Sequence, residues 1–211
     1  MFFLAGAATA GAQDAVEVTL GTDIVSRYVW RGQDLGGVSL QPTLGIGYKG
    51  LSLSAWGSVG LSQPSDAKEI DLTLGYTLGG FHIGVTDYYV ERNHVFEGTV
   101  GYDFGFASLN WYTNFAGNDI VGSTGKCAFS SYLEASVPFA LGGVDWTATA
   151  GVVPFATDYY NARRFAVVNL ALTASRPIRV TDSFSIPVFA QLALNPHSRH
   201  AFFVVGITLQ P

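Results

Sequence analysis

The chain has 211 residues, of which 48% are hydrophobic and only 13% charged, and its formal net charge is −5. Soluble domains carry about 25% charged residues, so too few charges remain here to cover a wetted outer surface. No run of about 18 apolar residues is present, which excludes a transmembrane helix but not membrane strands of about 9 to 11 residues. An acidic chain without a cluster of Lys and Arg is not expected to bind nucleic acid.

The amino terminus predicts export. Residues 1–12, MFFLAGAATAGA, look like the apolar part of a secretory signal peptide that ends in an Ala-Gly-Ala cleavage site. The positively charged start is missing, so either the true start lies upstream or the segment is a short apolar tail. We favour export, with residues 13–211 as a single domain. Cys127 is the only cysteine and no Cys/His cluster exists, so we expect no metal and no cofactor.

The first predicted strand covers residues 16–30. Apolar side chains, including Val18, Leu20, Tyr28 and Trp30, fall on one face, and every charge falls on the other. A polar loop, 31–37, leads to the clearest signal in the chain, a hairpin over residues 38–61. Its two runs alternate apolar residues with Ser, Thr, Gly and Gln around a Lys49-Gly50 turn.

The same alternation continues to the carboxyl terminus. Further strands are predicted at 70–78, 81–89, 96–104, 107–115, 130–139, 144–152, 167–175, 184–194 and 201–209. In the strand at 167–175, Val168 is assigned to the apolar face with Leu170 and Leu172. Tight glycine turns alternate with longer polar loops, and residues 176–183 form the longest connection on the tight-turn side. The pattern predicts an all-β, antiparallel, up-and-down transmembrane barrel of about 12 strands. If the amino terminus lies in the periplasm, the tight turns lie there too and the longer loops lie outside.

Aromatic residues on the apolar face gather near strand ends and form two predicted girdles, as at the two interfaces of a membrane. Tyr28, Trp30, Tyr89 and Phe115 are assigned to the girdle at the loops. Prolines 42, 138, 154 and 187 lie close to predicted strand ends, where bulges or frayed pairing would absorb them. The alternative is a soluble β-sandwich or jelly roll, but its outer face would be far poorer in Lys and Glu than soluble surfaces are.

A motif at the end of the first strand, Ser26-Arg27-Tyr28-Val29-Trp30-Arg31-Gly32-Gln33, resembles one near the amino terminus of the TorF family of proposed outer-membrane porins. Three further segments match that family in order and spacing: Leu40-Gln41-Pro42, Trp56-Gly57-Ser58, and Glu69-Ile70-Asp71 followed by Gly75-Tyr76. The resemblance covers roughly residues 21–90. It implies an outer-membrane β-barrel with a proposed channel role and no established substrate. Arg27 stands where an acidic residue is usual, which puts in doubt any ion pair made there by relatives.

The charged residues of the polar face are predicted to line the lumen. They are Glu17, Asp23, Asp71, Glu97, Asp103, Glu134 and Asp145, with Arg27, Arg31 and Lys49. If water fills the barrel, this acidic excess favours cations or neutral solutes. In the alternative, Arg27 and Arg31 bridge carboxylates and plug the lumen, into which Trp56, Tyr88, Tyr112, Tyr132 and Phe189 would project. The loops are interpreted as too short to fold inward.

Three functional hypotheses remain. The first is a passive channel for small solutes or ions in the bacterial outer membrane, and the second is a closed barrel that serves as a structural or interaction module. The third is a lipid-modifying enzyme, for which His82, His94, His197 and His200 are available, but none has a Ser at an informative spacing. We therefore expect no catalytic activity. The expected partners are outer-membrane lipid and small solutes, and the oligomeric state stays open.

Overall fold

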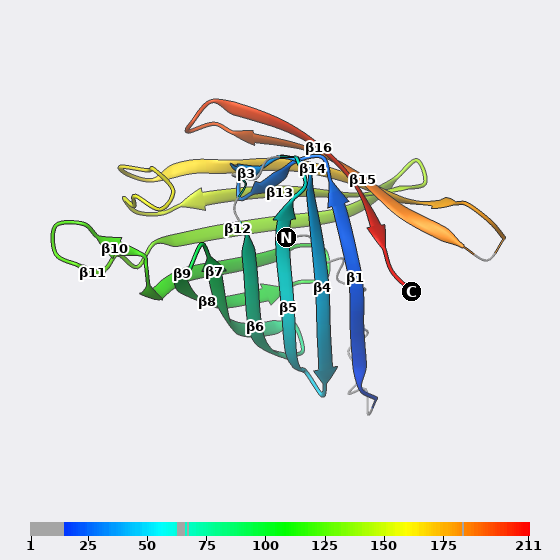
Figure 1. Ribbon diagram of the computed structural model, residues 1–211, viewed down its shortest axis with the longest axis horizontal. Coiled ribbons are helices and arrows are strands. Elements are labelled where there is room, and N and C mark those ends of the chain that lie inside the picture. Colours follow the sequence, from blue (N-terminus) through cyan, green and yellow to red (C-terminus); the bar gives the residue numbers. More distant parts are fainter. Residues whose placement is uncertain (1–14, 63–65, 67, 183) are drawn as a thin grey trace.

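Twelve strands form the wall of a closed antiparallel barrel in the computed structural model, which describes residues 15–62, 66, 68–182 and 184–211 (Figure 1). The wall strands are β1 (Glu17–Val25), β4 (Ser39–Tyr48), β5 (Leu51–Gly60), β6 (Glu69–Leu78), β7 (Phe81–Val90), β8 (Asn93–Asp103), β9 (Ser108–Gly117), β12 (Ser131–Leu141), β13 (Val144–Val153), β14 (Ala166–Arg179), β15 (Ser185–Asn195) and β16 (His200–Leu209). Each wall strand pairs with the wall strands before and after it in sequence. The predicted all-β up-and-down barrel is confirmed.

Two short hairpins lie between wall strands: β2 (Tyr28–Trp30) with β3 (Gln33–Gly36), and β10 (Ile120–Val121) with β11 (Lys126–Cys127). No helix among the described residues is long and apolar enough to cross a membrane. The predicted signal peptide at residues 1–12 lies outside the described residues.

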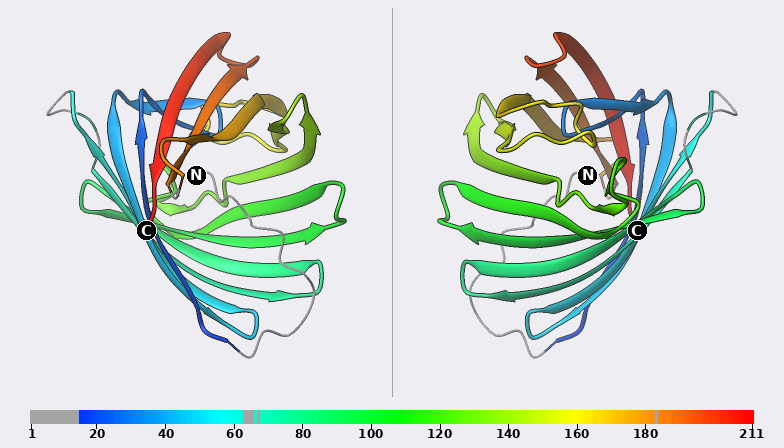
Figure 2. Two further views of the ribbon diagram at one scale, coloured as in Figure 1. Left: turned by 90° about the vertical axis from the view of Figure 1, so that its right-hand side faces the viewer. Right: turned by 90° about the vertical axis from the view of Figure 1, so that its left-hand side faces the viewer.

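The first strand closes the barrel because both of its edges are paired. It pairs with β4 from Glu17↔Gly47 to Val25↔Ser39, and with β16 over residues 22–25. We call the end of the barrel at Val25 the loop end and the opposite end, where the tight turns lie, the turn end. Figure 2 shows the wall strands as a ring, with the β2–β3 hairpin lying inside it.

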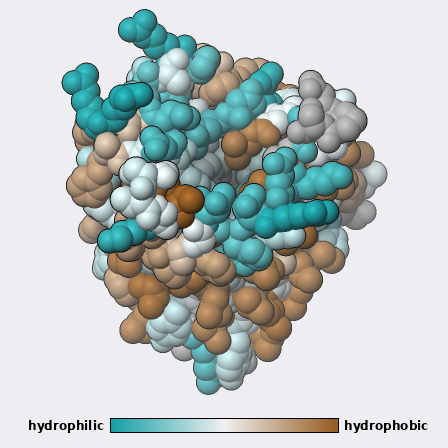
Figure 3. Space-filling model, turned by 60° about the vertical axis from the view of Figure 1, so that its left-hand side comes forward, coloured by the Kyte–Doolittle hydropathy of each residue, from teal (hydrophilic) through white to brown (hydrophobic). Residues whose placement is uncertain are grey.

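The two faces of the wall differ as the alternation predicts. One row of cross-strand neighbours on the outer face is about half exposed and entirely aliphatic: Ile46, Leu53, Leu74 and Val85. The neighbouring inward positions carry Gly, Ser and Thr. Figure 3 shows hydrophobic side chains over the wall and hydrophilic side chains gathered at the loop end. Because a barrel is a single closed sheet, no second sheet covers this apolar face, unlike in a sandwich.

The predicted first strand is wrong beyond Val25. The chain leaves the wall at Ser26, whose backbone N–H donates to the Val205 carbonyl oxygen at 2.8 Å, and whose hydroxyl accepts from the Val205 N–H at 2.9 Å. Tyr28 and Trp30 therefore belong to the inward hairpin and not to an outer girdle; Tyr28 is only 5% exposed. The apolar alternation of the sequence continues past this bend, because the side chains that the hairpin carries into the lumen are aromatic as well.

Two further predictions are wrong in detail. Val168 is not on the outer face: the β13–β14 register shifts beside Val152, and the resulting bulge turns Val168 inward, where it is 1% exposed. Residues 176–179 continue β14 instead of forming a turn. Residues 177–179 pair with residues 185–187 of β15 beyond the last residues that β13 and β16 contact, so a two-stranded ribbon projects from the turn end (Figure 1).

The prolines sit where the sheet tolerates them. The β4–β5 ladder is interrupted between Leu40 and Thr43, on either side of Pro42. Pro187 pairs with Pro177 in the projecting ribbon, and Pro154 follows the last residue of β13. Pro138 lies in β12 beyond Ser136, the last residue that pairs with β9. At these positions the missing backbone N–H of proline costs the sheet little stability, because strand pairing there is interrupted or is present on one side alone.

Candidate functional site

The β2–β3 hairpin crosses the lumen at the loop end, and we call it the plug. Tyr28 at its start donates from its hydroxyl to Glu69 of β6 at 2.8 Å. At its turn, Gly32 has a φ of +75°, and a Cβ there would overlap the Val168 carbonyl oxygen. The Asn195 amide of β15 donates to the Gly32 carbonyl oxygen at 3.1 Å. Contacts with opposite sides of the wall therefore hold the plug across the opening.

Arg31 at the tip of the plug makes the central contact. Its guanidinium donates two hydrogen bonds to the Glu97 carboxylate of β8, at 2.6 and 2.9 Å. It also donates to the Tyr160 hydroxyl at 2.7 Å, and Tyr88 donates to Glu97 at 2.8 Å. The side chains of Arg31 and Glu97 are 8% and 2% exposed. A bidentate pair in which each partner makes a further hydrogen bond is the arrangement that favours a buried ion pair.

Aromatic rings enclose the same guanidinium. The Arg31 Cζ atom lies 4.4 Å from the ring centre of Trp30, 4.1 Å from that of Tyr112 and 4.6 Å from that of Tyr132. These distances are within the range of cation–π attraction, which strengthens where water is excluded. The tip of the plug is thus held in place by one cation, the Arg31 guanidinium, which contacts one carboxylate and the faces of three aromatic rings.

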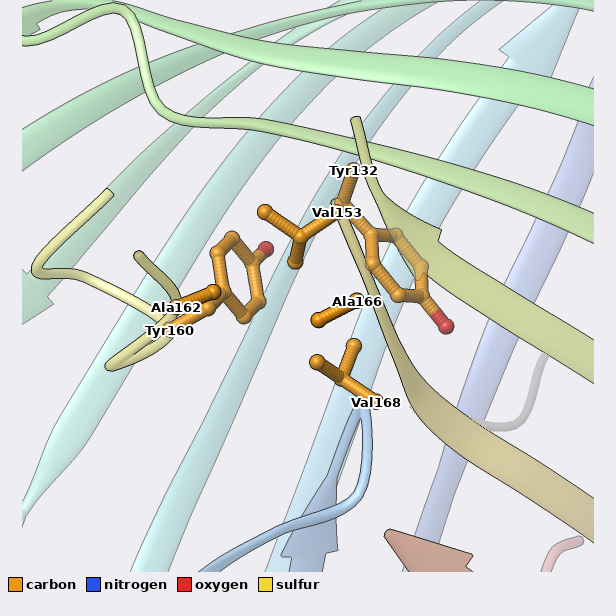
Figure 4. Close-up of a cluster of buried hydrophobic side chains, with 6 residues drawn as sticks. All are labelled: Tyr132, Val153, Tyr160, Ala162, Ala166 and Val168. Atoms are coloured by element: carbon orange, nitrogen blue, oxygen red, sulfur yellow. The ribbon is translucent and has the colours of Figure 1, made fainter. Parts of the chain in front are cut away.

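The loop from 154 to 165 completes the obstruction, because it folds inward after β13. Figure 4 shows Tyr160 of this loop beside Val153, with Ala162, Ala166 and Val168 close by and Tyr132 on the facing side. The Tyr160 ring stacks on those of Tyr132 and Trp30, with ring centres 5.7 and 6.0 Å apart. The interpretation that the loops are too short to fold inward is therefore wrong: the segments before β4 and after β13 both fill the lumen.

Arg31 and Tyr160 lie outside the wall strands, and the pKa values of both are shifted. Burial is the largest single influence and would lower the pKa of Arg31, but the Glu97 carboxylate together with the Tyr160 and Tyr88 hydroxyls outweighs it, and the pKa lies well above its ordinary value. Burial raises the pKa of the Tyr160 hydroxyl. Arg31 is therefore charged and Tyr160 neutral at every physiological pH, so the plug has no titrating switch in these two groups.

The turn-end half of the lumen is lined differently. Its inward residues are small and polar, and many are half-buried: Gly45, Gly47, Ser54, Thr73, Gly75, Gly84, Thr99, Ser136, Thr147 and Thr149. His82 and Asn110 bond at 2.6 Å across β8, where Gly101 leaves room for them. We call this half the vestibule. It opens at the turn end and stops at the plug.

The structure distributes the predicted lumen residues unevenly along the barrel. Glu97 and Asp71 are buried at the plug, at 2% exposure each. Glu134 accepts a bond from the Tyr132 hydroxyl at 2.6 Å, and Asp23 accepts one from Thr208 at 2.6 Å. The remaining acids, which are exposed near the turn end, are Glu17, Asp103 and Asp145.

Two of the predicted basic residues lie at the two ends of the barrel and not at the central ion pair. Lys49 lies in the exposed turn after β4, outside the wall strands, with its ammonium 5.3 Å from the centre of the Tyr48 ring. Arg27 is exposed at the loop end, where it pairs with Asp34 of the same hairpin. Arg31, by contrast, lies inside the barrel and pairs with a carboxylate of the wall, Glu97.

Two residues at the centre of the site were missed by sequence reasoning. Trp30 was assigned to the outer face, and Tyr160 to an external loop. No local pattern marks either residue, because each is placed by a change of chain direction. The only signal was indirect: a Trp-Arg-Gly sequence places a positive-φ glycine directly after a bulky pair, which is typical of a sharp turn.

Among the described residues one Ser–His contact is present, where the exposed turn after β15 enters β16. The Ser198 hydroxyl and the His200 ring lie 3.0 Å apart. Among the residues that the structure describes, no carboxylate is bonded to His200, and its ring contacts Phe202. The pair lacks the orienting third group of a nucleophilic site, so the enzyme hypothesis gains no support from it.

Comparisons with known proteins place the chain only at the level of family. No curated protein matches it. The model of a family described as bacterial proteins of unknown function, Gcw_chp, matches residues 9–175, across the plug and most of the wall. The chain therefore belongs to the Gcw_chp family of bacterial proteins.

Proposed function

We propose that this protein is a bacterial outer-membrane barrel that forms a passive channel for small polar solutes or ions, closed at its loop end by the plug. The observation that carries the proposal is the vestibule: the turn-end half of the lumen is lined by small, polar, half-buried side chains, and it ends at one buried ion pair. A barrel needed only as a membrane anchor would have no use for an interior lined by small polar side chains.

The membrane location is supported by the outer face. Large apolar side chains on the wall are about half exposed, among them Leu44, Leu53, Leu72, Ile83 and Val100. A contiguous apolar belt of this kind is stable in hydrocarbon and aggregates in water. The resemblance of residues 21–90 to TorF-type outer-membrane porins agrees with this location. Outer-membrane lipid would then be the partner of the wall.

Cations are the favoured ions. Glu69, Asp71 and Glu97 are buried near the plug beside the Arg31 guanidinium, while Arg27 of the same hairpin pairs with Asp34. If the plug withdrew, this acidic excess would face the pore and attract cations.

A second candidate, a closed barrel acting as a structural or interaction module, is favoured by the packing of the plug. Tyr132 and Glu97 are almost fully buried, and the cavity between the plug and β4, β15 and β16 has a volume of only about 20 Å³. That volume holds about one water molecule. The two candidate functions differ in one respect: a channel requires the plug to leave the lumen at times, and a structural module does not.

Conductance in planar bilayers separates them. The wild type is expected to conduct rarely and briefly, because the plug must move first. Val25 and Ser39 are paired across β1 and β4, so residues 27–37 can be replaced by Gly-Gly without disturbing the wall. This variant should conduct more often and for longer than the wild type, although the loop from 154 to 165 still narrows the lumen, and it should prefer K⁺ to Cl⁻, since Glu69 and Glu97 then face water.

The matched control shortens the other inserted hairpin. Ile120 and Val121 of β10 are exposed outside the lumen, so replacing residues 121–126 with Gly-Gly should leave conductance at the wild-type level. A wild type that is silent at every voltage would favour the structural module. Large steady conductance of the wild type would refute the plug itself.

A further inference from the structure

Four residues from the wall and the inward loop form a cage around the Arg31 guanidinium. Glu97 comes from β8, Tyr112 from β9, Tyr132 from β12 and Tyr160 from the loop after β13. None of them belongs to the plug. The cage therefore consists of parts that stay in place if the plug withdraws.

The cage is also fixed by its own contacts. Tyr132 donates to Glu134 at 2.6 Å and accepts from the Asn169 amide at 3.2 Å. Glu97 accepts from Tyr88, and the Tyr160 ring stacks on that of Tyr132. None of these four contacts involves Arg31. The carboxylate and the rings are consequently preorganised for a cation, which lowers the ordering cost of binding one.

The geometry selects a particular kind of cation. Both Glu97 oxygens receive parallel N–H bonds, and Tyr160 receives a third, all in the plane of the guanidinium. The Tyr112 and Tyr132 rings lie against Cζ at 4.1 and 4.6 Å. A planar guanidinium fits this site, because its N–H groups match the Glu97 oxygens and its weakly hydrated faces match the tyrosine rings. A compact ammonium or K⁺ matches neither the pair of oxygens nor the ring faces as well.

We propose that this cage is a binding site for solutes that carry a guanidinium group, and that Arg31 occupies it as an internal ligand when the channel is closed. The proposal rests on the proposed channel in one respect, namely that the plug can leave. It adds the substrate class: alkylguanidinium cations entering through the acidic vestibule would compete with Arg31 for Glu97 and the rings.

The test uses methylguanidinium and the purified Arg31→Ala barrel in detergent, with binding followed by calorimetry. Arg31→Ala should bind methylguanidinium, and bind methylammonium and neutral methylurea at least about tenfold more weakly, because neither makes a charged bidentate pair. Adding Glu97→Gln should weaken methylguanidinium binding by about tenfold or more. Arg27→Ala, which removes an exposed arginine from the same hairpin, and the wild type should show no binding at the same concentrations.

Other results would overturn the proposal: equal binding of the three probes, binding unaffected by Glu97→Gln, or binding by the wild type at the same affinity. If Arg31→Ala folds poorly, the folded fraction is measured by heat-modifiable gel mobility, and methylguanidinium but not methylurea should restore it. Failure of that rescue also refutes the site. Because binding is measured without a bilayer, an absent conductance would count against the channel and not against the cage.

Discussion

Replacing Glu97 with Ala should lower the free energy of unfolding by about 3–5 kcal/mol, the largest effect we expect from one side chain in the lumen. The change leaves the Arg31 guanidinium buried without its carboxylate and removes the acceptor of the Tyr88 hydroxyl. Urea unfolding in lipid vesicles, followed by tryptophan fluorescence, measures the loss. Trp30 lies beside the pair, so its emission should also shift as water enters.

Asp34→Ala provides the matched control. It breaks the other Arg–carboxylate pair of the same hairpin, but both Arg27 and Asp34 are exposed. An exposed pair contributes about 0–1 kcal/mol. If Glu97→Ala and Asp34→Ala cost the same small amount, the plug is not held as described.

Replacing Leu74 with Arg should destabilise the barrel in lipid by about 2–4 kcal/mol, since a charge on the lipid face of a barrel is costly near the bilayer midplane. Leu74 is central on the outer face, between Leu53 of β5 and Val85 of β7, and is 52% exposed. In a water-soluble protein the same substitution at a half-exposed site would change stability little. Equilibrium unfolding from vesicles gives the difference directly.

The Leu61→Arg variant tests how the cost of a charge depends on its depth in the membrane, because Leu61 and Leu74 are about equally exposed. Leu61 follows β5 at the loop end and is 58% exposed, and a charge near the interface costs only about 0–1 kcal/mol. Equal and small effects of Leu61→Arg and Leu74→Arg would show that the wall faces water.

The wall could be predicted from the sequence because each strand reports its own orientation. The runs at 38–48 and 51–61 correspond closely to β4 and β5, and their Gly, Ser and Thr face the lumen as expected. A strand with one apolar and one polar face carries this information locally. The tight glycine turns likewise indicate the order of the strands, because each of them joins two strands that are neighbours in the barrel.

The plug could not be predicted, because nothing local distinguishes its aromatic residues from those of a membrane girdle. Tyr28 and Trp30 keep the parity of the first strand, and the bend is produced by Ser26 bonding to Val205, 179 residues away in sequence. The Arg31–Glu97 pair was anticipated only as an alternative in which Arg31 meets some carboxylate. Which one it meets depends on barrel closure, a long-range property.

The orientation of Val168 could not be predicted from the alternation of apolar and polar residues alone. One extra residue at a bulge reverses the face of the side chain, and the alternation on either side conceals it. Here the bulge brings Val168 against Tyr160 and places its carbonyl under Gly32, so a single irregularity helps to seat both inward segments.

Quenching of tryptophan fluorescence by lipids brominated in their acyl chains tests the membrane-barrel account most directly. Two single-tryptophan variants are compared: one keeps Trp111, on the outer face of β9 and 39% exposed, and the other keeps Trp56, which is inside the barrel and 6% exposed. The account predicts strong quenching of Trp111 and almost none of Trp56. Trp111 fluorescence that ignores the brominated chains while the barrel is folded would contradict it.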